Sequence, residues 1–267
     1  YWPARLRGGY VGVDAFFVIS GYLITSHLLR EVDRTGTVRL SAFYARRARW
    51  LLPASILVLL FAALGTILLL PTDLWASTAH EVTASGFYVQ NLWLASKAVT
   101  YSASNDVASP VLHYWSLSAE EQFYLVWPSL IIISCLLARR WLRGRVTMNI
   151  GLTLLLVTVG SFIVSIWATQ THRAAAYFIT PTRAWEFGAG ALVVLLMRRW
   201  GPDLVLARML RWLGMFGCLP SAWFFSDPTS FTVYASLLPV TAPSASLLLW
   251  ASGRRGPAAA SSRWRAV

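Results

Sequence analysis

The apolar residues of this chain fall in long continuous blocks and do not recur at the three- to four-residue spacing of an amphipathic helix. A helix of roughly 20 residues crosses the hydrocarbon core of a bilayer. By that measure the blocks predict an all-α, polytopic transmembrane helical bundle with about seven spans. The predicted spans are 10–29, 51–70, 113–137, 147–168, 179–197, 212–226, which is short, and 232–251.

The segment 71–112, between the second and third predicted spans, has a different pattern. It opens with Pro71 and Asp73 and contains the apolar run GFYVQNLWLA at 86–95, which is too short to cross a bilayer. Irregular backbone at membrane depth is tolerated only where protein covers it. We therefore expect an interfacial or re-entrant segment that packs against other helices.

Composition supports a membrane protein, because 57% of the residues are apolar and 13% are charged, against roughly a quarter charged in soluble domains. The net charge of +12 could indicate a nucleic-acid partner. However, the basic residues lie in short clusters between apolar blocks, most of them after the first, third and fifth predicted spans. We therefore expect no nucleic acid as a partner, lipid around the spans, and these clusters on the cytoplasmic side.

Neither a disulfide nor a metal site is predicted. Cys135 and Cys218 lie far apart inside apolar blocks, where buried thiols are expected. None of the four histidines has metal-ligand spacing, so we interpret them as interfacial polar residues. His113, at the outer start of the third span, is the histidine most relevant to substrate binding.

Ionisable side chains inside predicted spans mark candidate sites, because they are costly in lipid. Asp14 lies one turn inside the first span, where the alternative is a helix-end aspartate paired with Arg5 or Arg7. In the third span Ser116, Glu120 and Tyr124 recur every four residues, which predicts one shared helix face.

Glu121 is expected to point elsewhere, and Glu120 to lie about 10 Å below the external surface. The two carboxylates could exchange protons in a shared pocket or be hydrated in an external vestibule. In the fifth span Arg183 and Glu186 are three residues apart, so they can pair with each other. The ion pair could be purely structural or catalytic. With Asp14 and Glu120, they predict a polar pocket in the outer third of the membrane.

On the cytoplasmic side, Arg46 and Arg49 precede the second span three residues apart. Guanidinium groups at this spacing could bind phosphates bidentately. The alternative is a cluster that only sets the orientation of the span.

Four segments together resemble the acyltransferase-3 family: GGYVGVDAFFVISGYLITSHLLRE, FYARRARWLLP, HYWSLSAEEQFYLVWP and TRAWEFGAGAL. The resemblance implies a bacterial enzyme of the inner, or plasma, membrane. Such enzymes transfer an acyl group, usually acetyl from acetyl-CoA, to a hydroxyl of an extracytoplasmic glycan. Acyl-CoA would be a donor substrate, and no permanently bound cofactor is implied.

The resemblance also implies residue roles. The R-x-x-R pair of the donor site maps onto Arg46 and Arg49. The remaining motif positions carry catalytic roles for Glu120, Tyr124, Arg183 and Glu186 and substrate contacts for Trp115 and Trp185. Asp14 would join the Arg183 and Glu186 pair in shaping the acceptor side.

The principal family motif, an Arg or Lys separated by ten residues from a His on the first helix, is expected to precede Tyr1. Residues 1–252 are thus interpreted as an incomplete acyltransferase domain, inactive by itself, with 253–267 as a basic tail or linker that could lead to a soluble domain. A proton-coupled transporter or flippase of a lipid-linked glycan is the alternative, although repeated halves with interrupted helices are not evident. A non-catalytic membrane scaffold is a third interpretation.

Overall fold

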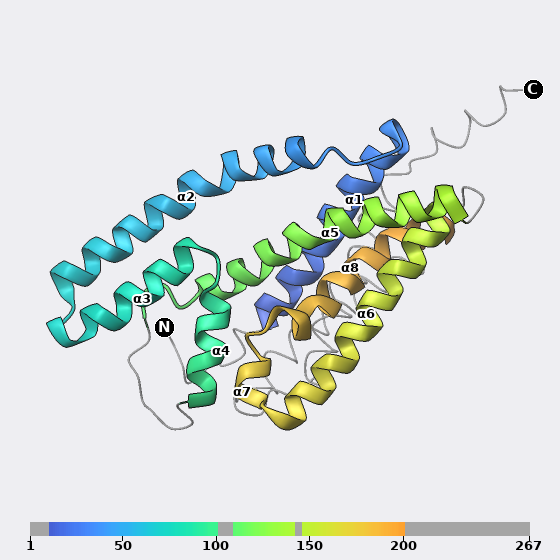
Figure 1. Ribbon diagram of the computed structural model, residues 1–267. Helices are drawn as coiled ribbons and strands as arrows, with labels where there is room; N and C mark the ends of the chain where they lie inside the picture. The colour runs from blue at the N-terminus through green and yellow to red at the C-terminus, as the bar shows by residue number, and fades with distance from the viewer. Residues whose placement is uncertain (1–10, 101–108, 142–145, 201–267) are drawn as a thin grey trace, which may run out of the picture. The chain divides into compact units, whose positions relative to one another are not determined.

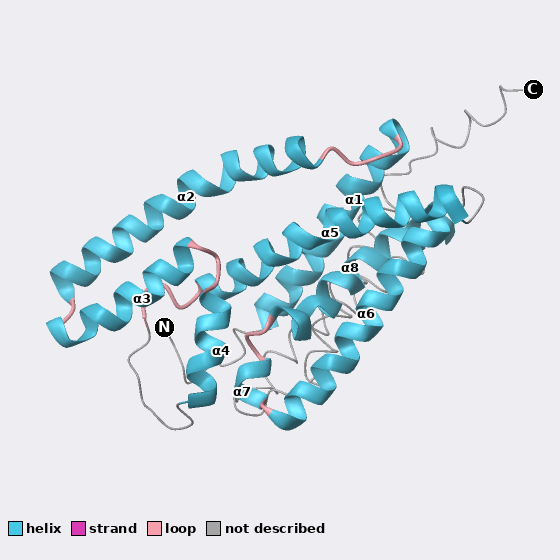
Figure 2. Ribbon diagram, viewed as in Figure 1, coloured by secondary structure: helices cyan, strands magenta, loops and turns pink. Residues whose placement is uncertain are grey.

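The computed structural model describes residues 11–100, 109–141 and 146–200, where every regular element is a helix and the loops are short (Figure 2). This confirms the all-α class. The described ranges contain five longer and four shorter helices, and Figure 1 labels the α-helices among them. The longer helices are α1 (Val11–Thr35), α2 (Leu40–Leu69), α5 (Tyr114–Trp141), α6 (Val146–Thr171) and α8 (Thr180–Trp200). The shorter helices are η1 (Thr72–Leu74), α3 (Trp75–Gly86), α4 (Gln90–Thr100) and α7 (Arg173–Ala176).

Four of the described helices are long and apolar enough to cross a membrane, and they correspond to the first four predicted spans. They comprise Gly12–Thr35, Leu40–Leu69, Tyr114–Arg140 and Val146–Thr171. The fifth predicted span is the helix α8, which is not among the four. It carries charged residues near both ends within its 21 residues. The last two predicted spans and the predicted domain boundary lie outside the described residues, so the count of seven stays a prediction.

The chain divides into two compact units. One consists of Leu28–Thr153 and Val159–Ala184 in their described parts. The other holds the described parts of Tyr1–His27, Leu154–Thr158 and Trp185–Val267. We call them the large unit and the small unit.

Within the large unit, α2 and α5 run in opposite directions with a defined register. The Tyr44 hydroxyl donates to the Leu125 carbonyl at 2.8 Å, and the Tyr114 hydroxyl donates to the Ser55 carbonyl at 3.1 Å. Residues 44–55 therefore lie beside residues 114–125. The rest of α2 extends about 20 Å beyond the start of α5, and its large apolar side chains there are mostly exposed, as on a lipid-facing helix.

The helix α3 returns along the part of α2 that extends beyond α5, as Figure 1 shows. A Cβ atom at Gly86, the last residue of α3, would lie 3.7 Å from the Leu59 side chain. The next helix, α4, packs against α5 and α7. For residues 71–100 this agrees with the expectation that the segment packs against other helices, although the predicted apolar run at 86–95 is divided between α3, a turn and α4.

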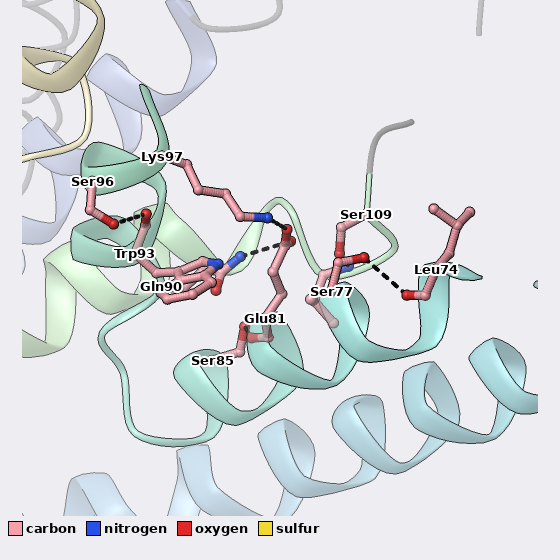
Figure 3. Close-up of polar contacts among 10 residues, drawn as sticks. Leu74, Ser77, Glu81, Ser85, Gln90, Trp93, Ser96, Lys97 and Ser109 are labelled. Atoms are coloured by element: carbon pink, nitrogen blue, oxygen red, sulfur yellow. Dashed lines mark hydrogen bonds and ion pairs between the residues drawn. The ribbon is translucent and has the colours of Figure 1, made fainter. Parts of the chain in front are cut away.

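A buried carboxylate joins α3 to α4 (Figure 3). Glu81 of α3, which is buried, accepts hydrogen bonds from Lys97 at 3.1 Å and from the Gln90 amide at 3.2 Å. Both donors belong to α4. Charge-assisted hydrogen bonds of this kind each contribute roughly 1.5–3 kcal/mol, so Glu81 fixes the angle of the α3–α4 turn.

A second polar network joins α4, α5 and the start of α8. Asn91 donates to the Phe178 carbonyl at 3.1 Å and to the Thr180 hydroxyl at 3.0 Å. The Thr180 hydroxyl in turn donates to the Gln122 side chain at 2.6 Å, and the Gln122 amide donates to Asn91 at 2.9 Å. Because Asn91 is fully buried, these bonds hold the first turns of α5 in place.

In the small unit, the backbones of α1 and α8 approach closely at two glycines. A Cβ atom on Gly21 would overlap the Phe187 carbonyl, and one on Gly190 would overlap the Val18 carbonyl. The rings of Phe17 and Phe187 stack at 4.5 Å beside this crossing. Small residues at helix crossings are the usual basis of association in membranes, where lipid removes the hydrophobic driving force.

Candidate functional site

The centre of the candidate site is an arginine of α2 that lies against the first two turns of α5. Arg47 Nε donates to both oxygens of Glu121, at 2.7 and 3.0 Å, and its Nη2 also contacts Glu121 Oε1. The same Nη2 lies 3.7 Å from Glu120 Oε2. The guanidinium carbon is 3.5 Å from the centroid of the Tyr124 ring. One cation is therefore held by two carboxylates and an aromatic face.

This assembly is largely removed from solvent. The exposed fractions of the side chains are 24% for Arg47, 7% for Glu120 and 18% for Glu121. Removing one partner from such a group leaves a buried charge uncompensated, which costs about 3–5 kcal/mol. The two carboxylates have different roles in the geometry: Glu121 takes the short hydrogen bonds, whereas Glu120 lies further from the cation.

The register of α2 on α5 changes the predicted depths. From the sequence, the arginine cluster before the second span and Glu120 belong to opposite sides of the membrane. In the structure Arg47 is level with Glu120, because α2 is displaced along α5 by about half its length. Although Glu121 was expected to point elsewhere than Glu120, the long Arg47 side chain reaches both carboxylates.

A second predicted group comes together at the start of α8 in the large unit. Arg183 is 1% exposed and donates from Nε to the Tyr177 carbonyl at 3.1 Å. Its guanidinium carbon lies 4.6 Å from the Tyr177 ring centroid and 5.8 Å from that of Trp115. The Trp115 ring also packs against Tyr177 and Phe178. Trp115 and Arg183, from distant parts of the sequence, thus share one aromatic environment.

The small unit contains the other predicted catalytic carboxylates. Asp14 is fully buried in the first turn of α1, where the positive end of the helix dipole favours a negative charge. Glu186 is fully buried and Trp185 nearly so in α8. Arg5 and Arg7, the alternative partners of Asp14, lie outside the described residues. The proposed pairing of Arg183 with Glu186 stays a prediction.

The predicted donor-side arginines are exposed. Arg46 lies 3.9 Å from Glu31 with its side chain 48% exposed, and Arg49 is exposed on α2. Glu31 also lies 3.7 Å from Arg39 and fixes the turn between α1 and α2. His113 is exposed in the turn before α5. These positions are compatible with ligand contact, but the phosphate and substrate roles stay predictions.

Sequence reasoning missed four residues that shape the site: Arg47, Tyr88, Asn91 and Gln122. Arg47 was one of several basic residues in a cluster, and only the register of two helices distinguishes it. Asn91 and Gln122 had a signal: polar groups within or beside apolar runs need partners in the protein.

Comparison with known proteins agrees with this arrangement of motifs. A family model described as an acyltransferase domain, that of acyltransferase family 3, matches residues 2–263. This chain belongs to the acyltransferase-3 family. The resemblance of the four sequence segments is therefore confirmed. A membrane protein of this family agrees with the four described helices that are long and apolar enough to cross a membrane.

Several acyltransferase-3 relatives carry names of O-acetyltransferases. A Staphylococcus aureus (strain COL) protein, provisionally named an O-acetyltransferase, is 38% identical over 198 residues, or 74% of this chain and 31% of the relative. The peptidoglycan O-acetyltransferase OatA of Listeria monocytogenes is 33% identical over 189 residues, covering 69% of this chain and 29% of the relative. O-acetyltransferase OatA of Staphylococcus aureus (strain NCTC 8325) is 36% identical over 197 residues, covering 74% and 31%.

The chain thus spans about a third of the length of the curated relatives it matches. No solved structure matches it.

Proposed function

We propose that the full-length protein is an O-acyltransferase of the bacterial plasma membrane. It would move an acyl group, acetyl in the simplest case, from cytoplasmic acyl-CoA to a hydroxyl of an extracytoplasmic glycan. Peptidoglycan is one candidate acceptor, because a relative is named for its O-acetylation.

The observation that carries this proposal is the buried Arg47–Glu120–Glu121 group beside Tyr124. Acyl transfer to a sugar requires removal of the hydroxyl proton, and a carboxylate in a site sheltered from water can accept or relay it. A guanidinium held within this group also balances negative charge that develops on the acyl oxygen. The groups proposed for both functions lie together where α2 packs against the start of α5.

The acceptor side is proposed to include Trp115, Arg183 and His113 from the large unit. Trp115 and Arg183 offer an aromatic face and a cation, and His113 is exposed in the turn just before α5. Asp14, Trp185 and Glu186 of the small unit keep the roles that the family motifs assign to them. A sugar hydroxyl would be oriented by such polar groups before it reacts.

The proposal is tested with membranes that contain the full-length protein, labelled acetyl-CoA on the cytoplasmic side and cell-wall glycan on the other. We expect label in an alkali-labile ester on the glycan. Transport of a lipid-linked glycan without label transfer would favour a transporter instead. Absence of both label transfer and donor binding would favour a scaffold.

A double replacement, Arg46→Ala with Arg49→Ala, tests the donor side in the same assay. We expect the KM for acetyl-CoA to rise about tenfold or more, because two guanidinium contacts to phosphate would be lost. The rate at saturating acetyl-CoA should change little. Arg198→Ala, which removes another basic residue of the predicted cytoplasmic side, is the matched control. An unchanged dependence on acetyl-CoA concentration would contradict the phosphate role.

A further inference from the structure

Tyr88, in the turn between α3 and α4, has a backbone conformation that is unusual for its side chain. Its φ is +56°, in the left-handed region. The turn is closed by a bond from the Val89 N–H to the Ala84 carbonyl at 2.9 Å and one from the Tyr88 N–H to the Ser85 carbonyl at 3.1 Å. This is a Schellman motif, in which the position of Tyr88 is usually occupied by glycine.

The left-handed conformation costs roughly 1–2 kcal/mol for a residue with a Cβ atom. The protein maintains it through Gln122, whose side-chain amide donates to the Tyr88 carbonyl at 2.9 Å. Gln122 directly follows the two glutamates of the candidate site. A strained conformation that the surrounding structure holds in place is characteristic of functional sites.

The Tyr88 hydroxyl is buried next to that site. Among the described residues it has no hydrogen-bond partner: its oxygen lies near Ser55 but does not meet the geometry of a bond. Tyr88 is close enough to Glu121, Tyr114 and Arg47 to interact with them electrostatically. Burial raises the pKa of the Tyr88 phenol above its ordinary value of 10.0; the nearby Ser55 side chain and the Arg47 charge oppose this shift, and the Glu121 charge adds to it. The phenol is therefore protonated at neutral pH and can donate a hydrogen bond.

We propose that Tyr88 is a substrate-binding residue whose buried hydroxyl donates a hydrogen bond to the carbonyl oxygen of the transferred acyl group. This proposal rests on the proposed function. A buried donor without a partner loses the free energy of its hydrogen bond until an acceptor arrives. An acyl carbonyl bound beside Arg47 and Glu121 supplies that acceptor, and its oxygen becomes more negative as the acyl group is attacked. The strained turn holds the phenol at the point where this charge develops.

The experiment compares the full-length protein with its Tyr88→Phe variant in the labelled acetyl-CoA assay. Phenylalanine keeps the ring and the backbone conformation and removes only the hydroxyl. We expect kcat to fall about 10- to 100-fold with the KM for acetyl-CoA nearly unchanged, because the bond strengthens in the transition state. A kcat equal to that of the unchanged protein, or an effect confined to the KM, would overturn the proposal.

Tyr88→Gly separates this role from a structural one. Glycine adopts the left-handed conformation without steric cost, so the turn of the Tyr88→Gly variant should be no more strained than that of the tyrosine protein, while transfer is again slow. Loss of transfer that parallels loss of folded protein in both variants would show a structural role and overturn the proposal. If the unchanged protein itself transfers no acetyl, the proposed function fails; if it transfers and Tyr88→Phe matches it, only the role of Tyr88 fails.

Discussion

The full-length protein with Glu120→Gln is expected to transfer acetyl groups about 10²- to 10⁴-fold more slowly, the usual contribution of a positioned general acid or base. Glutamine has the size and shape of glutamate, so packing in the first turns of α5 should be preserved. The buried Glu120 carboxylate, 3.7 Å from Arg47 Nη2, would however become a neutral amide that cannot accept the proton. The measurement is acetyl transfer per inserted molecule, with insertion quantified separately.

Glu121→Gln is the matched comparison, since it changes the neighbouring residue of the same helix in the same way. Glu121 accepts the short hydrogen bonds from Arg47, so its replacement should mainly lower stability by weakening the ion pair. We expect a smaller loss of transfer and a larger loss of thermal stability than with Glu120→Gln. Normal transfer by Glu120→Gln would refute a catalytic Glu120, and the opposite ranking would assign the proton to Glu121.

The contacts of Arg47 also bear on how the donor and acceptor sides could communicate. Arg46 and Arg49 flank Arg47 in sequence, and Arg47 itself contacts both glutamates of α5. If Arg46 and Arg49 hold the donor phosphates, the carboxylates lie at most a few residues of helix away from them. The proposed path for the acyl group is then shorter than the full thickness of the membrane, which is the distance expected when the arginine cluster and Glu120 are placed on opposite sides.

The helical class and the first four spans were predictable because lipid imposes a composition that can be recognised residue by residue. The packing of 71–100 against other helices followed from the same requirement. The register between α2 and α5 was not predictable, because it depends on three side-chain contacts between distant residues: those of Tyr44, Arg47 and Tyr114. The alternation of charges along the sequence records which side a loop occupies and contains no information on sliding between helices.

The candidate site shows the same division. Glu120, Tyr124, Trp115 and Arg183 were predicted from motifs, and the structure places each in a buried polar or aromatic environment. Tyr88 could not be found in this way, because its significance lies in a backbone angle and in an unmatched hydroxyl. Both are properties of the folded chain. Local sequence preference would be misleading here, because glycine is the residue usually found at this position of such turns.

Gly21→Ala is expected to destabilise the full-length protein by about 1–3 kcal/mol or more, although alanine is the better helix former. Helix propensity alone predicts a gain of up to about 1 kcal/mol. The added methyl group would overlap the Phe187 carbonyl, which belongs to backbone and cannot rotate away. The sign of the change, measured by thermal or denaturant unfolding in detergent, therefore decides whether close packing of α1 and α8 holds the small unit together.

Gly12→Ala is the control, because it lies on the same helix and a Cβ atom there has no neighbour within 4 Å in the part of the chain that the structure describes. It should be neutral or stabilising. Asp14 lies between these two glycines on α1, and Glu186 precedes the Phe187 contact on α8. Separation of the helices by Gly21→Ala should therefore expose both carboxylates and lower acetyl transfer together with stability. Equal unfolding midpoints for the two variants would show that the close approach of α1 and α8 does not contribute to folding.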